Sequence, residues 1–167
     1  RTVTVTLRGW KPSEPEKNMV DWPDVAPKLL LTTSPDWQAK AVWFHGVQED
    51  AKAFAVTPEL GKVADEVTAG LERADDKVAA LTHWVAENIR YIGLHMGEGE
   101  GYTLHPAAMT LRDRGGVCKD KAGILTALLR AAGFEAYAGM TMAGERIEKI
   151  AADQFNHCIT VWRRPDG

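Results

Sequence analysis

The chain has 167 residues, of which 45% are hydrophobic and 26% charged, proportions typical of a globular domain with one sizeable core. Its formal net charge is −3 and its lysines and arginines are scattered, so it lacks the clustered basic surface of a nucleic-acid-binding protein. No apolar run approaches the roughly 18 residues of a membrane-spanning helix. Two cysteines without a Cys-x-x-Cys pair exclude a disulfide scaffold and a zinc or redox motif of that type.

The first 33 residues combine two predicted strands with a connector. Residues 2–7 alternate Thr and Val, which predicts a strand. Residues 9–27 are rich in Pro, Glu and Lys and predict a connector, and residues 28–33 predict a short apolar strand. Because strand character is present from the start and no Met precedes it, we expect a piece of a longer protein, with residues 34–167 as the main domain.

Three helices are predicted next. Ser34-Pro35-Asp36 and Thr57-Pro58-Glu59 are strong helix starts, with Ser or Thr as N-cap and Pro in the first turn. They predict one helix that ends near Phe54 and a second that stops at Gly70. A third helix is predicted to start near Asp75, and its apolar residues recur at helical spacing.

The segment after the third helix is rich in glycine and acid. Residues 97–101 read Gly-Glu-Gly-Glu-Gly, which predicts a flexible surface loop, with the wall or lid of a cleft as the functional alternative. It is not a phosphate-binding loop, because it follows a helix, lacks a Lys-Ser/Thr ending and carries acid where phosphate would be repelled. His105-Pro106-Ala107 opens a short helical turn to about Asp113.

The stretch from Arg114 to Gly133 is predicted to form the central helix. Gly115 and Gly116 lead to Cys118, and apolar residues then recur at three- and four-residue spacing up to Gly133. A cysteine at the start of a buried helix lies where unpaired N–H groups and the helix dipole favour a thiolate. We assign no packing role to the glycine pair and interpret it as room for the backbone and a substrate to approach closely.

After Gly133 the hydrophobic period changes to two. Residues 135–142 and 155–162 predict two strands, with His157 on one face of the second and Cys158 on the other. The residues from Arg164 to Gly167 predict a β-turn. Helices followed by these strands predict an α+β fold, in which the helix that bears Cys118 packs on an antiparallel sheet.

Cys118 and His157 are the candidate catalytic residues. A thiolate at a helix N-terminus and an imidazole held on a strand form an activated nucleophile and its base, and the backbone N–H of Cys118 could be an oxyanion donor. Spacing alone leaves open an inert buried cysteine with a hydrogen-bonded core histidine, or a Cys118–Cys158 bridge that would consume the nucleophile.

The other polar and aromatic candidates are assigned structural roles. No metal or cofactor is expected, because the remaining histidines lack metal-ligand spacing; they are predicted to be solvated or to lie in loops (His45, His83, His95 and His105). Cys158 is predicted to be a small core residue. Tyr91 and Trp84 could line a cleft, but packing in the core or at its rim is favoured.

Three motifs in this order resemble the core of the transglutaminase-like superfamily: Arg114-Gly-Gly-Val-Cys-Lys-Asp-Lys-Ala, Leu128-Leu-Arg-Ala-Ala-Gly-Phe and Asn156-His157. Ile89-Arg-Tyr-Ile-Gly and His105-Pro-Ala resemble its bacterial branch, whose members often carry an upstream β-rich domain of unknown function. The resemblance covers roughly residues 35–167, and it implies that residues 1–33 are the end of such an upstream β-rich domain or the linker that leaves it.

The resemblance implies a papain-like α+β core with a Cys-His-Asp triad. Cys118 would attack an amide or acyl carbonyl, and His157 would be first the base and then the acid for the leaving amine. The third member would be an aspartate on the strand after the histidine's hairpin, and is expected beyond Gly167. Neither Asp166, which belongs to the turn, nor Asp153 is assigned that role, so weakened or absent turnover is expected of this chain.

The function expected from this resemblance is thiol-dependent acyl chemistry on peptide or protein amides. Hydrolysis by a cysteine peptidase or amidase is favoured over transglutaminase-type acyl transfer. The alternative is a catalytically silent module that binds peptide or glycan or scaffolds the β-rich neighbour. The expected partners are a peptide or protein substrate and the upstream domain of the same parent chain, and analogy to the bacterial branch implies a cell-envelope or periplasmic location.

Overall fold

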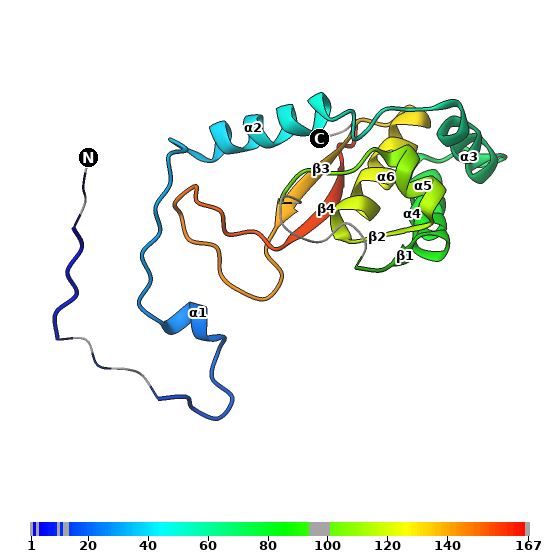
Figure 1. Ribbon diagram of the computed structural model, residues 1–167. Coiled ribbons are helices and arrows are strands. Elements are labelled where there is room, and N and C mark those ends of the chain that lie inside the picture. The colour runs from blue at the N-terminus through cyan, green and yellow to red at the C-terminus, as the bar shows by residue number, and fades with distance from the viewer. Residues whose placement is uncertain (1, 3, 10, 12–13, 94–100, 166–167) are drawn as a thin grey trace.

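The computed structural model describes residues 2, 4–9, 11, 14–93 and 101–165 (Figure 1). Predictions on the Gly97–Glu100 part of the glycine-rich loop, on His95 and on Asp166 lie outside these residues. The elements are α1 (Trp22–Val25), α2 (Trp37–Asp50), α3 (Pro58–Thr68), α4 (Ala74–Asn88), β1 (Arg90–Tyr91), α5 (Ala107–Asp113), β2 (Gly115–Gly116), α6 (Cys118–Ala131), β3 (Ala136–Thr141) and β4 (His157–Trp162). The predicted α+β fold is confirmed.

Side-chain caps decide where the first long helices begin. The Asp36 carboxylate accepts a 2.7 Å hydrogen bond from the Ala39 N–H, so Asp36 is the N-cap of α2 rather than the predicted Ser34. This helix ends at Asp50, short of the predicted Phe54. Thr57 is the N-cap of α3, as predicted, with its hydroxyl oxygen 3.4 Å from the Leu60 nitrogen and Pro58 in the first turn.

Helix α6 lies at the centre of the domain. Figure 1 shows α3, α4 and α5 gathered on one side of it and the β3–β4 hairpin against it on the other. The apolar residues that the four helices bury together are Leu60, Ala64, Leu81, Val85, Ile89, Ala107, Ile124, Ala127, Leu128 and Leu129. Because α6 is enclosed from both sides, it buries polar residues as well as apolar ones, including Asp120.

The hairpin is antiparallel, with Ala136 opposite Trp162 and Thr141 opposite His157. One face contacts α6, where the Thr160 hydroxyl donates a 3.0 Å hydrogen bond to the Ala122 carbonyl. The other face carries His157 and leaves Ile159 and Val161 44% and 46% exposed. The structure therefore confirms both predicted strands and the opposite orientations of His157 and Cys158.

The two glycines before Cys118 form β2, which pairs in parallel with β1. The Ile92 N–H donates to the Gly116 carbonyl at 3.1 Å. A Cβ on Gly115 would overlap the Ile92 side chain, and a Cβ on Gly116 would lie 2.5 Å from the Cβ of Asp120. Both glycines are buried, so the prediction that they have no packing role is wrong: close approach to neighbouring side chains requires them.

The N-terminal segment does not form the two predicted strands. The described residues of 2–7 and residues 28–33 are extended without strand pairing, and Val5 and Leu7 are largely exposed. A strand needs a partner for its backbone groups, and the described chain offers these residues none. The division of the chain at residue 34 and the upstream domain stay predictions.

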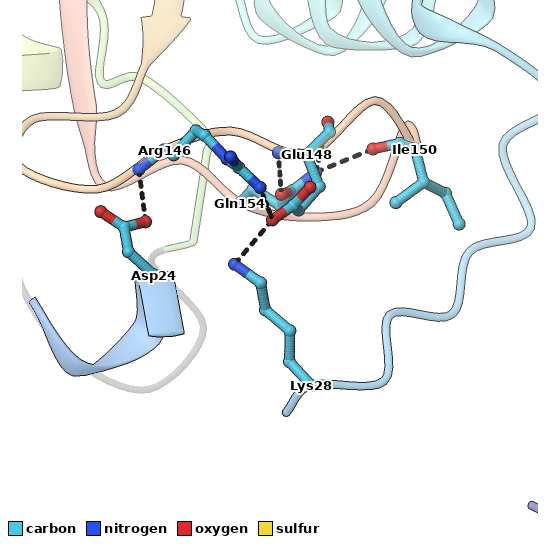
Figure 2. A network of polar contacts seen from close by, with 6 residues as sticks. All are labelled: Asp24, Lys28, Arg146, Glu148, Ile150 and Gln154. Atoms are coloured by element: carbon cyan, nitrogen blue, oxygen red, sulfur yellow. Dashed lines mark hydrogen bonds and ion pairs between the residues drawn. The ribbon is translucent and has the colours of Figure 1, made fainter. Parts of the chain in front are cut away.

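Residues 24–40 instead contact the loop between β3 and β4 (Figure 2). The Arg146 N–H donates to the Asp24 carboxylate at 3.0 Å, and Lys28 and Glu148 form a 3.1 Å ion pair. Further contacts join Thr32 to the Ala151 carbonyl, Trp37 to the Lys149 carbonyl, and Lys40 to Asp153. We call residues 24–40 the N-terminal strap.

The described helices include none with both the length and the apolar character needed to cross a bilayer.

Candidate functional site

Cys118 and His157 line the same groove. It lies between α4, α6 and β4 and has a volume of about 310 Å³. Its other lining residues are mostly apolar: Thr82, Val85, Ala86, Tyr91, Lys121, Ala122, Leu125, Cys158, Ile159 and Thr160. The fold thus brings together the two residues that the sequence singled out, one from a helix start and one from a strand start.

Cys118 is the first residue of α6 and carries a free, half-buried thiol. The bond from the Lys121 N–H to the Val117 carbonyl, 3.0 Å long, opens the helical ladder. The N–H groups of residues 118–120 precede it and have no partner within the helix. These groups and the dipole of a 14-residue helix stabilise negative charge at the position of the sulfur.

Asp120 lies behind Cys118 and is fully buried. One carboxylate oxygen accepts the Val117 N–H at 2.9 Å, and the other lies 2.9 Å from Nδ1 of His105. The His105 side chain is 20% exposed and the residue lies in the loop before α5, one of the two settings predicted for it, and His45 and His83 are exposed as predicted. One sequence feature could have indicated the role of Asp120: an acidic residue at the third position of a helix can accept the N–H of the N-cap residue.

Tyr91 reaches the groove from β1. Its side chain is 62% exposed and lines the groove with Cys118. Partial burial of the phenol, together with the charge of the Cys118 thiolate and a hydrogen bond to that side chain, raises the pKa of Tyr91. Sequence reasoning favoured a packing role, and neither spacing nor hydrophobicity distinguishes a groove tyrosine from a rim tyrosine. Trp84 does pack at the core, with the Arg114 guanidinium 5.4 Å from its ring.

Lys121 connects two walls of the groove. Its ammonium donates hydrogen bonds to the carbonyls of Val85, at 3.3 Å, and Ile89 at the C-terminal end of α4. A cation at that end of a helix is favourable, although partial burial lowers the pKa of Lys121. This contact holds α4 against the first turn of α6, beside Cys118.

Cys158 is more deeply buried than Cys118. Its side chain is buried against α6, and burial, followed by the charges of Cys118 and Asp120, raises its pKa to about 12. A thiol that stays protonated at neutral pH is a poor nucleophile. Both cysteines are free, so the bridge considered for the sequence is absent and the prediction of a small core residue at 158 is confirmed.

His157 begins β4 and is half-buried. Within the described residues, its ring has no hydrogen bond or ion pair to a carboxylate. Asp153, four residues earlier, is occupied by Lys40. The outer edge of β4, beside the groove, has no strand partner in the described part of the chain.

Metal-binding groups and a second cavity were the other possible sites among the described residues. No group of three or more His, Cys, Asp and Glu side chains there could hold a metal ion. A second cavity, of about 300 Å³, lies between α2 and β3 and is lined by aromatic residues that include Trp37, Phe44, Tyr102 and Phe155. It contains none of the candidate catalytic residues.

Comparison with known proteins indicates the family and the fold of the chain. A model of the transglutaminase-like superfamily matches residues 61–166. A crystal structure of a "putative protease" from Parabacteroides distasonis ATCC 8503 aligns with a TM-score of 0.58 and 19% identity over 78% of this chain and 25% of that one. A "putative cysteine protease" from Cytophaga hutchinsonii aligns with a TM-score of 0.45 and 25% identity over 62% of this chain and 32% of that one. The chain therefore spans about a third or less of each of these proteins, and no curated protein sequence matches it.

Proposed function

The chain belongs to the transglutaminase-like superfamily, and from this membership we propose that it performs thiol-dependent acyl chemistry, with Cys118 as nucleophile and His157 as general base and acid. The membership supports a peptidase or transglutaminase-type function in general. The observation that carries the assignment of residues is the shared groove, in which a thiol at a helix start and an imidazole on a strand face the same space.

In the proposed reaction, His157 takes the proton of the Cys118 thiol and the sulfur attacks the carbonyl carbon of a peptide or protein amide. The oxyanion accepts a hydrogen bond from the Cys118 N–H and, in this proposal, from the Tyr91 phenol. The C–N bond breaks, the imidazolium proton passes to the leaving amine, and a thioester remains. Water or an amine then attacks the thioester carbonyl and gives a proton to His157. The C–S bond breaks, the acyl group leaves as a carboxylic acid or an amide, and His157 returns the proton to the Cys118 sulfur.

Hydrolysis is the favoured second step. The groove is bordered by the exposed side chains of Tyr91 and Ile159, so water reaches the position of the thioester. Acyl transfer to an amine requires that water be kept away from this intermediate. The substrate class proposed is a peptide or protein amide, and the upstream β-rich domain is proposed as a partner in the same parent chain.

A third catalytic group is proposed to be a carboxylate on a strand that pairs with the outer edge of β4. The unpaired edge beside His157 supports this position, and an acid that orients the imidazole would hold it in the reactive tautomer. A catalytically silent module that binds peptide or glycan is the alternative function.

The test is the rate of Cys118 alkylation by iodoacetamide at neutral pH, with Cys158→Ala as the matched control that removes the second thiol. We expect Cys118 to be alkylated faster than a free cysteine under the same conditions, and His157→Gln should slow the reaction toward the rate of the free thiol. A p-nitrophenyl ester should then give a burst of nitrophenol that Cys118→Ala abolishes. An unreactive Cys118, or one alkylated no faster than a free cysteine, would support the silent module instead.

A further inference from the structure

The start of α6 has an unusual cap. Its N-cap residue, Val117, has no side-chain oxygen, so the cap that Ser, Thr, Asp or Asn normally provides from this position is missing. The N–H of Val117 is nevertheless satisfied, because Asp120 accepts it from within the first turn at 2.9 Å. The helix that carries Cys118 is therefore capped by its own third residue.

The surroundings of Asp120 hold its carboxylate in one place. The residue is fully buried, and Nδ1 of His105, which precedes α5, lies 2.9 Å from its second oxygen. Gly116 lies against the carboxylate from the other side, where a Cβ would be 2.7 Å from Oδ2. Three segments of the chain thus converge on one side chain next to the proposed nucleophile.

We propose that Asp120 is a positioning residue for Cys118. Through its bond to the Val117 N–H it fixes the backbone on which the thiol and the Cys118 N–H are presented, and His105 orients it for this role. The proposal deepens the proposed function and rests on it, since positioning matters only where the thiol reacts.

The negative charge of Asp120 and its hydrogen bond to the Val117 N–H should affect the Cys118 thiolate in opposite directions, so variants can separate the two effects. A buried carboxylate near a thiol disfavours the thiolate, because like charges repel. Asparagine at this position would keep an oxygen for the Val117 N–H and remove the charge, whereas alanine would remove both. The difference between these two variants therefore reports the hydrogen bond alone.

The experiment compares Asp120→Asn and Asp120→Ala in the Cys158→Ala background, with thermal melting to verify folding. We expect iodoacetamide to alkylate Cys118 about tenfold more slowly at neutral pH in Asp120→Ala than in Asp120→Asn, because the first turn loses the order that aligns the N–H groups next to the sulfur. Ester acylation should be about tenfold slower in Asp120→Ala at saturating ester, with asparagine restoring it. Equal alkylation and acylation rates in the two variants would overturn the proposal.

A second variant covers the case in which Asp120→Ala does not fold. His105→Ala removes one contact of the carboxylate and leaves the bond to Val117, so it should slow the alkylation of Cys118 by a smaller factor; an unchanged rate there would also overturn the proposal. A parent protein whose Cys118 is alkylated no faster than a free cysteine would defeat the proposed function itself, whereas fast alkylation that is insensitive to Asp120 and His105 would defeat only this inference.

Discussion

The two walls of the groove are built in different ways. The Cys118 wall is helix α6, which is enclosed by α3, α4, α5 and the hairpin and buries nine of its fourteen residues. The His157 wall is a two-stranded hairpin with one exposed apolar face and an outer edge that no described strand pairs. The loop that leads into His157 makes polar contacts to the N-terminal strap (Figure 2) and buries only small apolar side chains, those of Ala151 and Ala152.

We therefore expect variants on the two walls to change different properties of the protein. Changes on the Cys118 wall should cost folding free energy, because they alter close-packed and buried polar groups. Changes at the exposed and half-exposed side chains of the His157 wall should alter chemistry or local motion while global stability is kept. Cys158, which this wall buries against α6, is an exception.

The largest expected effect is the loss of activity in His157→Ala. Removal of a general acid–base group slows catalysis by about 10²- to 10⁴-fold, while the half-exposed ring should change the free energy of unfolding by less than about 1 kcal/mol. The rate of p-nitrophenyl ester turnover and a urea melt of the same sample measure both quantities. A variant that loses stability and activity together would contradict the division between the walls.

Gly116→Ala should destabilise the protein strongly. The added methyl group would lie 2.5 Å from the Cβ of Asp120 in a closed site, and overpacking of this kind costs about 1–3 kcal/mol. Chemical denaturation measures the change. The double variant with Asp120→Gly should be less destabilised than the sum of the single variants, because glycine removes both the Cβ and the carboxylate that the added methyl group would overlap.

The matched control is Gly139→Ala on the hairpin. A Cβ there would meet Val161 Cγ2 at an ordinary 3.4 Å on the exposed face. We expect a change within about 0.5 kcal/mol. If Gly116→Ala and Gly139→Ala lowered the free energy of unfolding equally, the two walls would tolerate added volume alike.

Cys158 should make stability fall at alkaline pH. The native thiol, with a pKa raised to about 12 from 9.0, stays protonated where the unfolded thiol ionises, so its contribution is complete below pH 9 and is lost as the pH rises toward 12. Between pH 9 and 10.5 the loss should be about 2 kcal/mol, since each pH unit in that window corresponds to about 1.4 kcal/mol. Urea melts of the parent and of Cys158→Ala give the difference, and parallel pH profiles would refute the linkage.

The smallest expected effect is that of Asp24→Ala in the N-terminal strap. An exposed contact of this type contributes less than about 1 kcal/mol, so the melting curve should barely move. Hydrogen exchange of the Arg146 amide should nevertheless become faster, because its acceptor is removed. The Glu148 amide, which donates to the Gln154 side chain at 2.8 Å, is the internal control. Equal acceleration at both amides would mean that the strap orders the whole loop.

The sequence alone was sufficient for what depends on short-range patterns. Helical spacing and the Thr57 cap predicted the helices, and the change to a period of two predicted the hairpin with His157 and Cys158 on opposite faces. The order of the motifs around Cys118 and His157 was enough to indicate the superfamily to which the chain belongs.

The tertiary structure determined the features that depend on contacts between distant segments of the chain. It left the predicted N-terminal strands unpaired, because alternation in a sequence does not supply a pairing partner. It brought Tyr91 to the groove and His105 to Asp120, contacts between segments that local periodicity does not encode. It also gave Gly115 and Gly116 a packing role, since a residue without a side chain reveals its reason only when the neighbours that press against it are in place.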